Sequence, residues 1–162
     1  MNIRALAAIT VGLALGAGSC AAQVSRKPPS ASPGCDANNV CRVYVTLEKG
    51  AGGKDEINVY PDTLFTKTGS KDAHVVWIIL NEGVTFLATK NIAIQQGDPT
   101  QWTDKYPTDD DDGARPIAGF TPKNFHGRFP VGSKEGTYKY AITVQRGGDA
   151  PVTKDPVIHN SR

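Results

Sequence analysis

The residues of this chain that could bind a metal ion are its three histidines and a run of four aspartates. Imidazole nitrogen is a good ligand for copper and zinc, and calcium prefers several carboxylates on a flexible loop. The histidines are widely separated, and Thr108 and Gly119 stand where the spaced pattern of a calcium-binding hand needs acids. The sequence therefore predicts solitary histidines and a solvated acidic loop, with a metal site as the alternative. The candidate ligands are His74, His126, His159, Asp109, Asp110, Asp111 and Asp112.

A long connection rich in aromatic residues runs from Gln95 to Phe129. Loops of that length on a small domain are usually functional or disordered, and the aromatic content argues against complete disorder. One interpretation is that Trp102, Tyr106 and His126 form a surface for a ligand or partner. The other, which we favour, is that three phenylalanines plug the end of the domain while Trp102 and Tyr106 cover it. These phenylalanines are Phe120, Phe125 and Phe129.

Catalytic motifs are missing from the sequence. It contains no nucleophile elbow, no zinc-protease motif and no glycine-rich phosphate loop. We therefore expect neither enzymatic activity nor a cofactor. A glycoside hydrolase needs two nearby carboxylates, which this chain would have only if Glu82, Glu135 and the aspartate run lay close together in the fold. The formal charge of +2 comes from 18 basic and 16 acidic residues without a basic, aromatic-rich cluster, so nucleic acid is not an expected partner.

The elements that must position these residues have the pattern of short β-strands. Alternation of apolar residues over 43–47 and 140–144 is typical of strands with one face on a core, with Thr143 facing water. The wholly apolar run 75–80 predicts a central strand that is covered on both faces. We expect an all-β fold, a Greek-key β-sandwich of about seven or eight strands. Residues 156–159 would pair at its edge because Pro156 lacks an amide donor.

Two cysteines close together, Cys35 and Cys41, stand at the beginning of the first predicted strand. In an exported domain they are expected to form a disulfide. By the chain-entropy relation, a loop this short contributes about 2 kcal/mol to stability. The alternative is a pair of free thiols.

The N-terminal residues have the pattern of an export signal. Arg4 is followed by a short apolar run, and a bilayer-spanning helix needs about 20 apolar residues. The stretch 17–20, Ala-Gly-Ser-Cys, resembles a bacterial lipobox. This resemblance implies a signal peptide over 1–19 and a lipid on Cys20. Residues 20–34 are poor in large apolar residues, so we expect a flexible tether there and a folded domain over 35–162.

Two details of this segment bear on where the protein is found. For a host with two membranes, Ala21 after the cysteine resembles lipoproteins sorted to the outer membrane, so we expect an outer-membrane lipoprotein that faces the periplasm or the exterior. A lipobox usually has Leu, Val or Ile where Ala17 stands. The alternative is therefore cleavage after Ala21 or Ala22, which would release a periplasmic or secreted protein.

Three segments of the domain resemble cupredoxins. Residues 57–64, followed by 75–79, are similar to the early strands of that family, and residues 136–140 to the strand that leads into the copper loop. The resemblance spans roughly residues 41–146 and implies a cupredoxin-like sandwich. Ile142 stands where the copper thiolate would be, and Asn81 and Glu82 where the first histidine would be. The resemblance thus implies a copper-free domain.

Together these features predict a cell-envelope lipoprotein with a copper-free, cupredoxin-like domain that acts as a binding or structural module. Its expected partners are the membrane, through the lipid anchor, and envelope proteins or polysaccharide. The alternative is a periplasmic copper-binding or electron-transfer protein with a non-standard site built from the histidines and aspartates named above.

Overall fold

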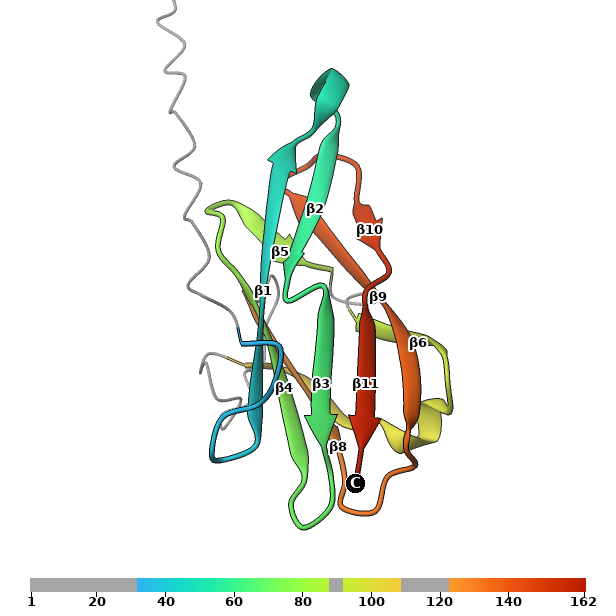
Figure 1. Ribbon diagram of the computed structural model, residues 1–162. Helices are drawn as coiled ribbons and strands as arrows, with labels where there is room; N and C mark the ends of the chain where they lie inside the picture. Colours follow the sequence, from blue (N-terminus) through green and yellow to red (C-terminus); the bar gives the residue numbers. More distant parts are fainter. Residues whose placement is uncertain (1–31, 88–91, 109–122) are drawn as a thin grey trace, which may run out of the picture.

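The computed structural model describes residues 32–87, 92–108 and 123–162, and this part of the chain consists mainly of β-strands (Figure 1). The strands are β1 (Val40–Lys49), β2 (Asp55–Tyr60), β3 (Thr63–Lys67), β4 (Ala73–Ile79), β5 (Val84–Phe86), β6 (Ile92–Gln96), β7 (Thr103–Thr108), β8 (Asn124–Phe129), β9 (Gly136–Arg146), β10 (Val152–Lys154) and β11 (Val157–Ser161). Two short 3-10 turns are η1 (Ala51–Gly53) and η2 (Pro99–Gln101). In these ranges we find no helix with the length and apolar character needed to cross a membrane.

The strands form two mixed sheets. One sheet has the order β2-β1-β4-β8-β7, in which β1 and β4 are parallel. In the other sheet, β3 pairs with β11 in parallel and β11 pairs with β9, which also pairs with β10, β5 and β6. The long strand β9 has two partners on each side, β11 and β10 along one edge and β6 and β5 along the other. The fold is therefore the predicted all-β sandwich.

The core lies between the two sheets and is centred on a pair of aromatic residues. Trp77 of β4 and Tyr140 of β9 are both fully buried, and their rings meet edge to face at 5.5 Å. Trp77 Nε1 donates a hydrogen bond to Tyr140 Oη at 3.2 Å. Burial raises the pKa of Tyr140, so its hydroxyl stays protonated. This bond satisfies two polar groups that would otherwise be costly inside the core.

The central position of β4, predicted from its apolar composition, is confirmed. The strand lies in the middle of its sheet, and Val76 and Ile78, which point away from the core, are also buried. The prediction for residues 156–159 was wrong, because β11 lies between β9 and β3 and not at an edge. Pro156 precedes the strand, where no amide donor is needed, and its carbonyl accepts a hydrogen bond from the Tyr140 N–H at 3.1 Å.

The eleven strands in the described ranges exceed the seven or eight expected from the sequence. Two of them, β7 and β8, lie in the segment from Gln95 to Phe129, which was expected to be a long connection. Another, β10, has only three residues, which is too short to show an alternation of apolar and polar residues. It is a strand because β9 is long enough to pair with it.

The residues before β1 run along the outer edge of β3. The Phe65 N–H donates to the Pro33 carbonyl at 2.7 Å, and Gly34 forms a parallel bridge with Phe65. The predicted disulfide between Cys35 and Cys41 is confirmed, and it joins this segment to the second residue of β1. The N-terminal segment therefore covers part of a strand edge that would otherwise be open to another chain.

Candidate functional site

The structure brings two of the three histidines together on the outer face of the β2-β1-β4-β8-β7 sheet. His74 of β4 and His126 of β8 are on neighbouring antiparallel strands, where His74 pairs with Arg128 and Val76 pairs with His126. The two histidines are therefore diagonal neighbours, a separation that long side chains can bridge. His74 Nδ1 lies 2.9 Å from His126 Nε2, which is a hydrogen bond. The prediction of solitary histidines is thus wrong for this pair.

The position of His126 is fixed by its surroundings. Its side chain is buried, with 1% of its surface exposed, whereas that of His74 is partly exposed. Tyr106 of β7 pairs with His126 in the sheet register, and the two rings stack with centres 4.4 Å apart and planes 24° from parallel. His126 is therefore held between neighbouring strands, and solvent reaches the pair from the side of His74.

An ion pair lies next to the two histidines. Arg128 Nη1 lies 2.6 Å from Asp72 Oδ2, and both side chains are about 30% exposed. The Val131 N–H donates to Asp72 Oδ1 at 2.7 Å. This hydrogen bond and the Arg128 guanidinium hold the pKa of Asp72 below its ordinary value, so the carboxylate is charged at neutral pH. The positive charge of Arg128 beside the histidines is thus compensated by Asp72.

Trp102 is a core residue rather than part of a ligand surface. It is 3% exposed and packs edge to face on Trp77 at 5.3 Å and on Phe129 at 4.6 Å. Phe125 and Phe129 are also buried, as the packing interpretation requires. The surface expected from Trp102, Tyr106 and His126 therefore does not form, because two of its three members are buried. Phe120 and the candidate ligands Asp109, Asp110, Asp111 and Asp112 lie outside the described residues, as does Cys20.

His159 lies in the other sheet, away from the first pair, and takes part in an exposed aromatic contact. Its ring stacks on Phe65 with centres 5.2 Å apart and planes 25° from parallel. His159 Nδ1 lies 2.9 Å from Thr137 Oγ1. Phe65 is 53% exposed although it is a large apolar side chain. We call Phe65, His159 and Thr137, which come from adjacent strands β3, β11 and β9, the aromatic face.

Sequence reasoning missed the aromatic face. Within β3 the buried Leu64 and Thr66 alternate with the exposed Phe65, so alternation alone indicates that Phe65 points away from the core. That signal could have identified Phe65. The contact with His159, by contrast, depends on the parallel pairing of β3 with β11, for which the sequence has no marker.

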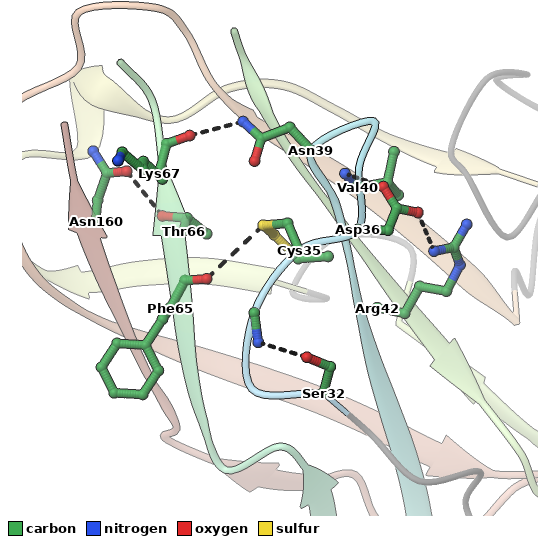
Figure 2. Close-up of a disulfide and its surroundings, with 12 residues drawn as sticks. Ser32, Cys35, Asp36, Asn39, Val40, Arg42, Phe65, Thr66, Lys67 and Asn160 are labelled. Carbon is green, nitrogen blue, oxygen red and sulfur yellow. Dashed lines mark hydrogen bonds and ion pairs between the residues drawn. A yellow bond between two sulfur atoms is a disulfide. The ribbon is translucent and has the colours of Figure 1, made fainter. Parts of the chain in front are cut away.

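The disulfide loop is held in place by polar contacts (Figure 2). Asp36 accepts hydrogen bonds from two backbone amides of the loop and, through Oδ2, from Arg42 Nη1 at 2.7 Å. The Arg42 guanidinium, together with those amides, lowers the pKa of Asp36. Asn39 adopts a φ of 61°, which asparagine tolerates, and its amide donates to the Lys67 carbonyl at 2.7 Å. These contacts join the loop to the end of β3.

A cleft of about 380 Å³ lies between this loop and the turn after β3, lined in part by Asn39, Lys67, Ser70 and Lys71. Its two lysines favour an anionic group over a cationic one. Asp36 also borders the cleft, but its carboxylate is already paired with Arg42.

Comparison with known proteins gives no family for this chain. No protein-family model matches it, and no curated protein matches it. Within the described ranges, no three side chains of His, Cys, Asp or Glu converge on one point as metal ligands. Among the described residues, the His74–His126 pair and the aromatic face are two arrangements that could act chemically.

Proposed function

We propose that this chain is a cell-envelope lipoprotein whose β-sandwich is a copper-free, cupredoxin-like module that binds an envelope polysaccharide. The lipobox-like segment ending at Cys20 and the polar stretch 20–34 support an anchored domain on a tether. The tether would join the domain at the edge of β3, next to Phe65.

The aromatic face is the observation that carries this proposal. Phe65 exposes more than half of its surface and is stacked on His159, so its orientation is fixed before any ligand arrives. A preoriented ring loses little side-chain entropy on binding. The apolar face of a sugar ring can pack on such an aromatic ring, while Thr137 and His159 are polar groups beside it that can bond to sugar hydroxyls.

The residues at the positions of the copper ligands support a copper-free module. Ile142, at the position of the thiolate, is completely buried in the core. Asn81, at the position of the first histidine, accepts a hydrogen bond from the Leu47 N–H at 2.7 Å through Oδ1. Ile142 therefore contributes to the packing of the core, and Asn81 supplies the hydrogen-bond acceptor for a backbone amide.

Co-sedimentation with purified peptidoglycan sacculi tests the proposed function. The full chain carrying Cys20→Ser, which cannot be lipidated, should pellet with the sacculi. Phe65→Ala should weaken binding roughly tenfold, since exposed aromatic anchors commonly contribute more than about 1 kcal/mol. Val131→Ala is the matched control, because Val131 is equally exposed at 53% and should leave binding unchanged.

The outcomes separate a polysaccharide from other partners. If neither sacculi nor a soluble envelope polysaccharide retains the protein, the polysaccharide proposal is wrong, and an envelope protein becomes the remaining partner class. Equal losses for Phe65→Ala and Val131→Ala would show that the aromatic face is not the site. The anchor is tested separately, because Cys20→Ser should release the chain from membranes.

A further inference from the structure

His74 and His126 present two ring nitrogens to one point, in a way that no other described pair of imidazoles does. The ring centres are 5.2 Å apart and the facing nitrogens 2.9 Å apart. The distance between the ring centres exceeds the distance between the nitrogens by about twice the distance from the centre of an imidazole to one of its nitrogens. Both nitrogens therefore lie nearly on the line that joins the ring centres, and they point almost directly at each other. One of them carries the hydrogen, and the other offers its lone pair.

We propose that His74 Nδ1 and His126 Nε2 are the two protein ligands of a copper ion, whose binding displaces the hydrogen that they share. Copper is the natural choice, because Cu(II) is the strongest binder in the divalent first-row series and imidazole is among its preferred ligands. This site is independent of the polysaccharide function, since it lies on the other sheet from the aromatic face. It is also not the cupredoxin copper site, whose ligand positions hold Ile142 and Asn81, and the term copper-free above refers to that site alone.

The separation of the two nitrogens equals the separation expected for two ligands of one metal ion. A metal–imidazole bond is about 2.0–2.1 Å long, so two such bonds at a right angle place the nitrogens roughly 2.9 Å apart. The present separation already equals that value. What must change is the place of the His74 ring, which has to swing so that its Nδ1 lies to one side of the axis of the His126 lone pair and both lone pairs point at the ion. His74 can make this movement because its side chain is only partly buried, while Tyr106 holds His126 in place.

Binding also requires the facing hydrogen to leave. In a neutral pair it is lost from the facing nitrogen while the other nitrogen of the same ring takes up a proton. In a singly protonated pair it is released to solvent. Both facing nitrogens then donate lone pairs to the ion, and no redox change is involved.

The charges around the pair permit a cation. Arg128 lies opposite His74 in the sheet, but its ion pair with Asp72 balances its charge. On the neighbouring strand β1, Arg42 is paired with Asp36. The described residues supply two ligands here, so water or a small external donor would occupy the remaining positions from the exposed side of His74.

A simple hydrogen bond that holds β4 to β8 is the competing explanation, and copper titration of the full chain distinguishes the two. The protein carries Cys20→Ser, so that no thiol binds or reduces the ion, and has no polyhistidine tag. Bound Cu(II) is measured by competition with a chromophoric chelator and by electron paramagnetic resonance. His159→Gln is the matched control, because it removes the third histidine from the other sheet.

We expect one Cu(II) per chain in the parent protein and in His159→Gln, with a spectrum that shows two imidazole nitrogens. His74→Gln and His126→Gln should both lose stoichiometric binding. Copper should raise the melting temperature of the parent but not of His74→Gln, since a ligand stabilises only the state that binds it. If His126→Gln does not fold, His74→Gln still decides the question because His74 is partly exposed. No stoichiometric copper in the parent, or unchanged binding in His74→Gln, would overturn the proposal.

Discussion

Gly127 is the position where the smallest change should have the largest effect on stability. It lies in β8 between His126 and Arg128, and the indole of Trp102 lies directly over its Cα. A methyl group at this position would lie 2.5 Å from Cε2 and 2.9 Å from Cη2 of Trp102, and closer still to Cζ2. These are atoms of a rigid ring, so Gly127→Ala cannot be accommodated by turning a flexible side chain.

The cost of Gly127→Ala can be bounded from this packing. Overpacking a filled core typically costs about 1–3 kcal/mol. Trp102 is 3% exposed and confined by Trp77 and Phe129, so we expect a value near the upper end. The loss in free energy of unfolding cannot exceed the cost of displacing the indole from the core altogether, which is about 3–5 kcal/mol for a buried aromatic residue. We therefore expect a loss of roughly 3 kcal/mol, which lowers the melting temperature of a domain of this size by about 10–15 °C.

Urea unfolding at 25 °C, followed by tryptophan fluorescence, measures this effect. Gly148→Ala is the control, because a methyl group there meets no atom within 4 Å and should change stability by less than about 0.5 kcal/mol. In a Trp102→Leu background the penalty of Gly127→Ala should shrink, since the overlapping ring is gone. The reasoning is refuted if Gly127→Ala is as stable as the control, or if its penalty is unchanged in that background.

Two further substitutions test the core and the disulfide loop. Tyr140→Phe removes the acceptor of the buried Trp77 Nε1–H and should cost about 1–3 kcal/mol in urea unfolding, so unchanged stability would contradict the hydrogen bond. Asp36→Asn should reduce stability at pH 7 by less than about 1 kcal/mol, because the Asp36–Arg42 pair is about one-third exposed and screened. The lowered pKa of Asp36 means that its contribution is present above the ordinary value of 3.8 and is lost as the pH falls through the lowered value. The difference from the parent should therefore shrink in unfolding curves below about pH 4, and a gap that persists to pH 2 would argue against the ion pair.

The fold class could be predicted from the sequence because alternation reports which residues share a face of a strand. It does not report whether the second face is covered. Thr143 was expected to face water, yet it is 9% exposed, and its hydroxyl lies 3.0 Å from Thr153 Oγ1 of β10. Thr46 of β1 alternates with core residues in the same way and is completely buried. For Thr143 this burial involves β10, which pairs with β9 from later in the chain.

The contact between His74 and His126 could not be predicted from the sequence, for a related reason. Each histidine stands between inward-pointing residues, so alternation places both on an outer face. Their contact, however, depends on the antiparallel register of β4 with β8, which joins residues 52 positions apart. The Cys35–Cys41 bridge was predictable, because a short separation in sequence already brings the two residues together.

The course of the N-terminal segment along β3 has a mechanical consequence. A pull on the chain ahead of Ser32, as from a membrane anchor, would reach the domain at Pro33 and Gly34, which are bonded to β3 of one sheet. From there the disulfide carries the load directly to Cys41 in β1 of the other sheet, so the intervening loop bears none of it. Tension would thus be divided between the two sheets rather than peeling one terminal strand away, and reduction of the disulfide would place the whole loop under load.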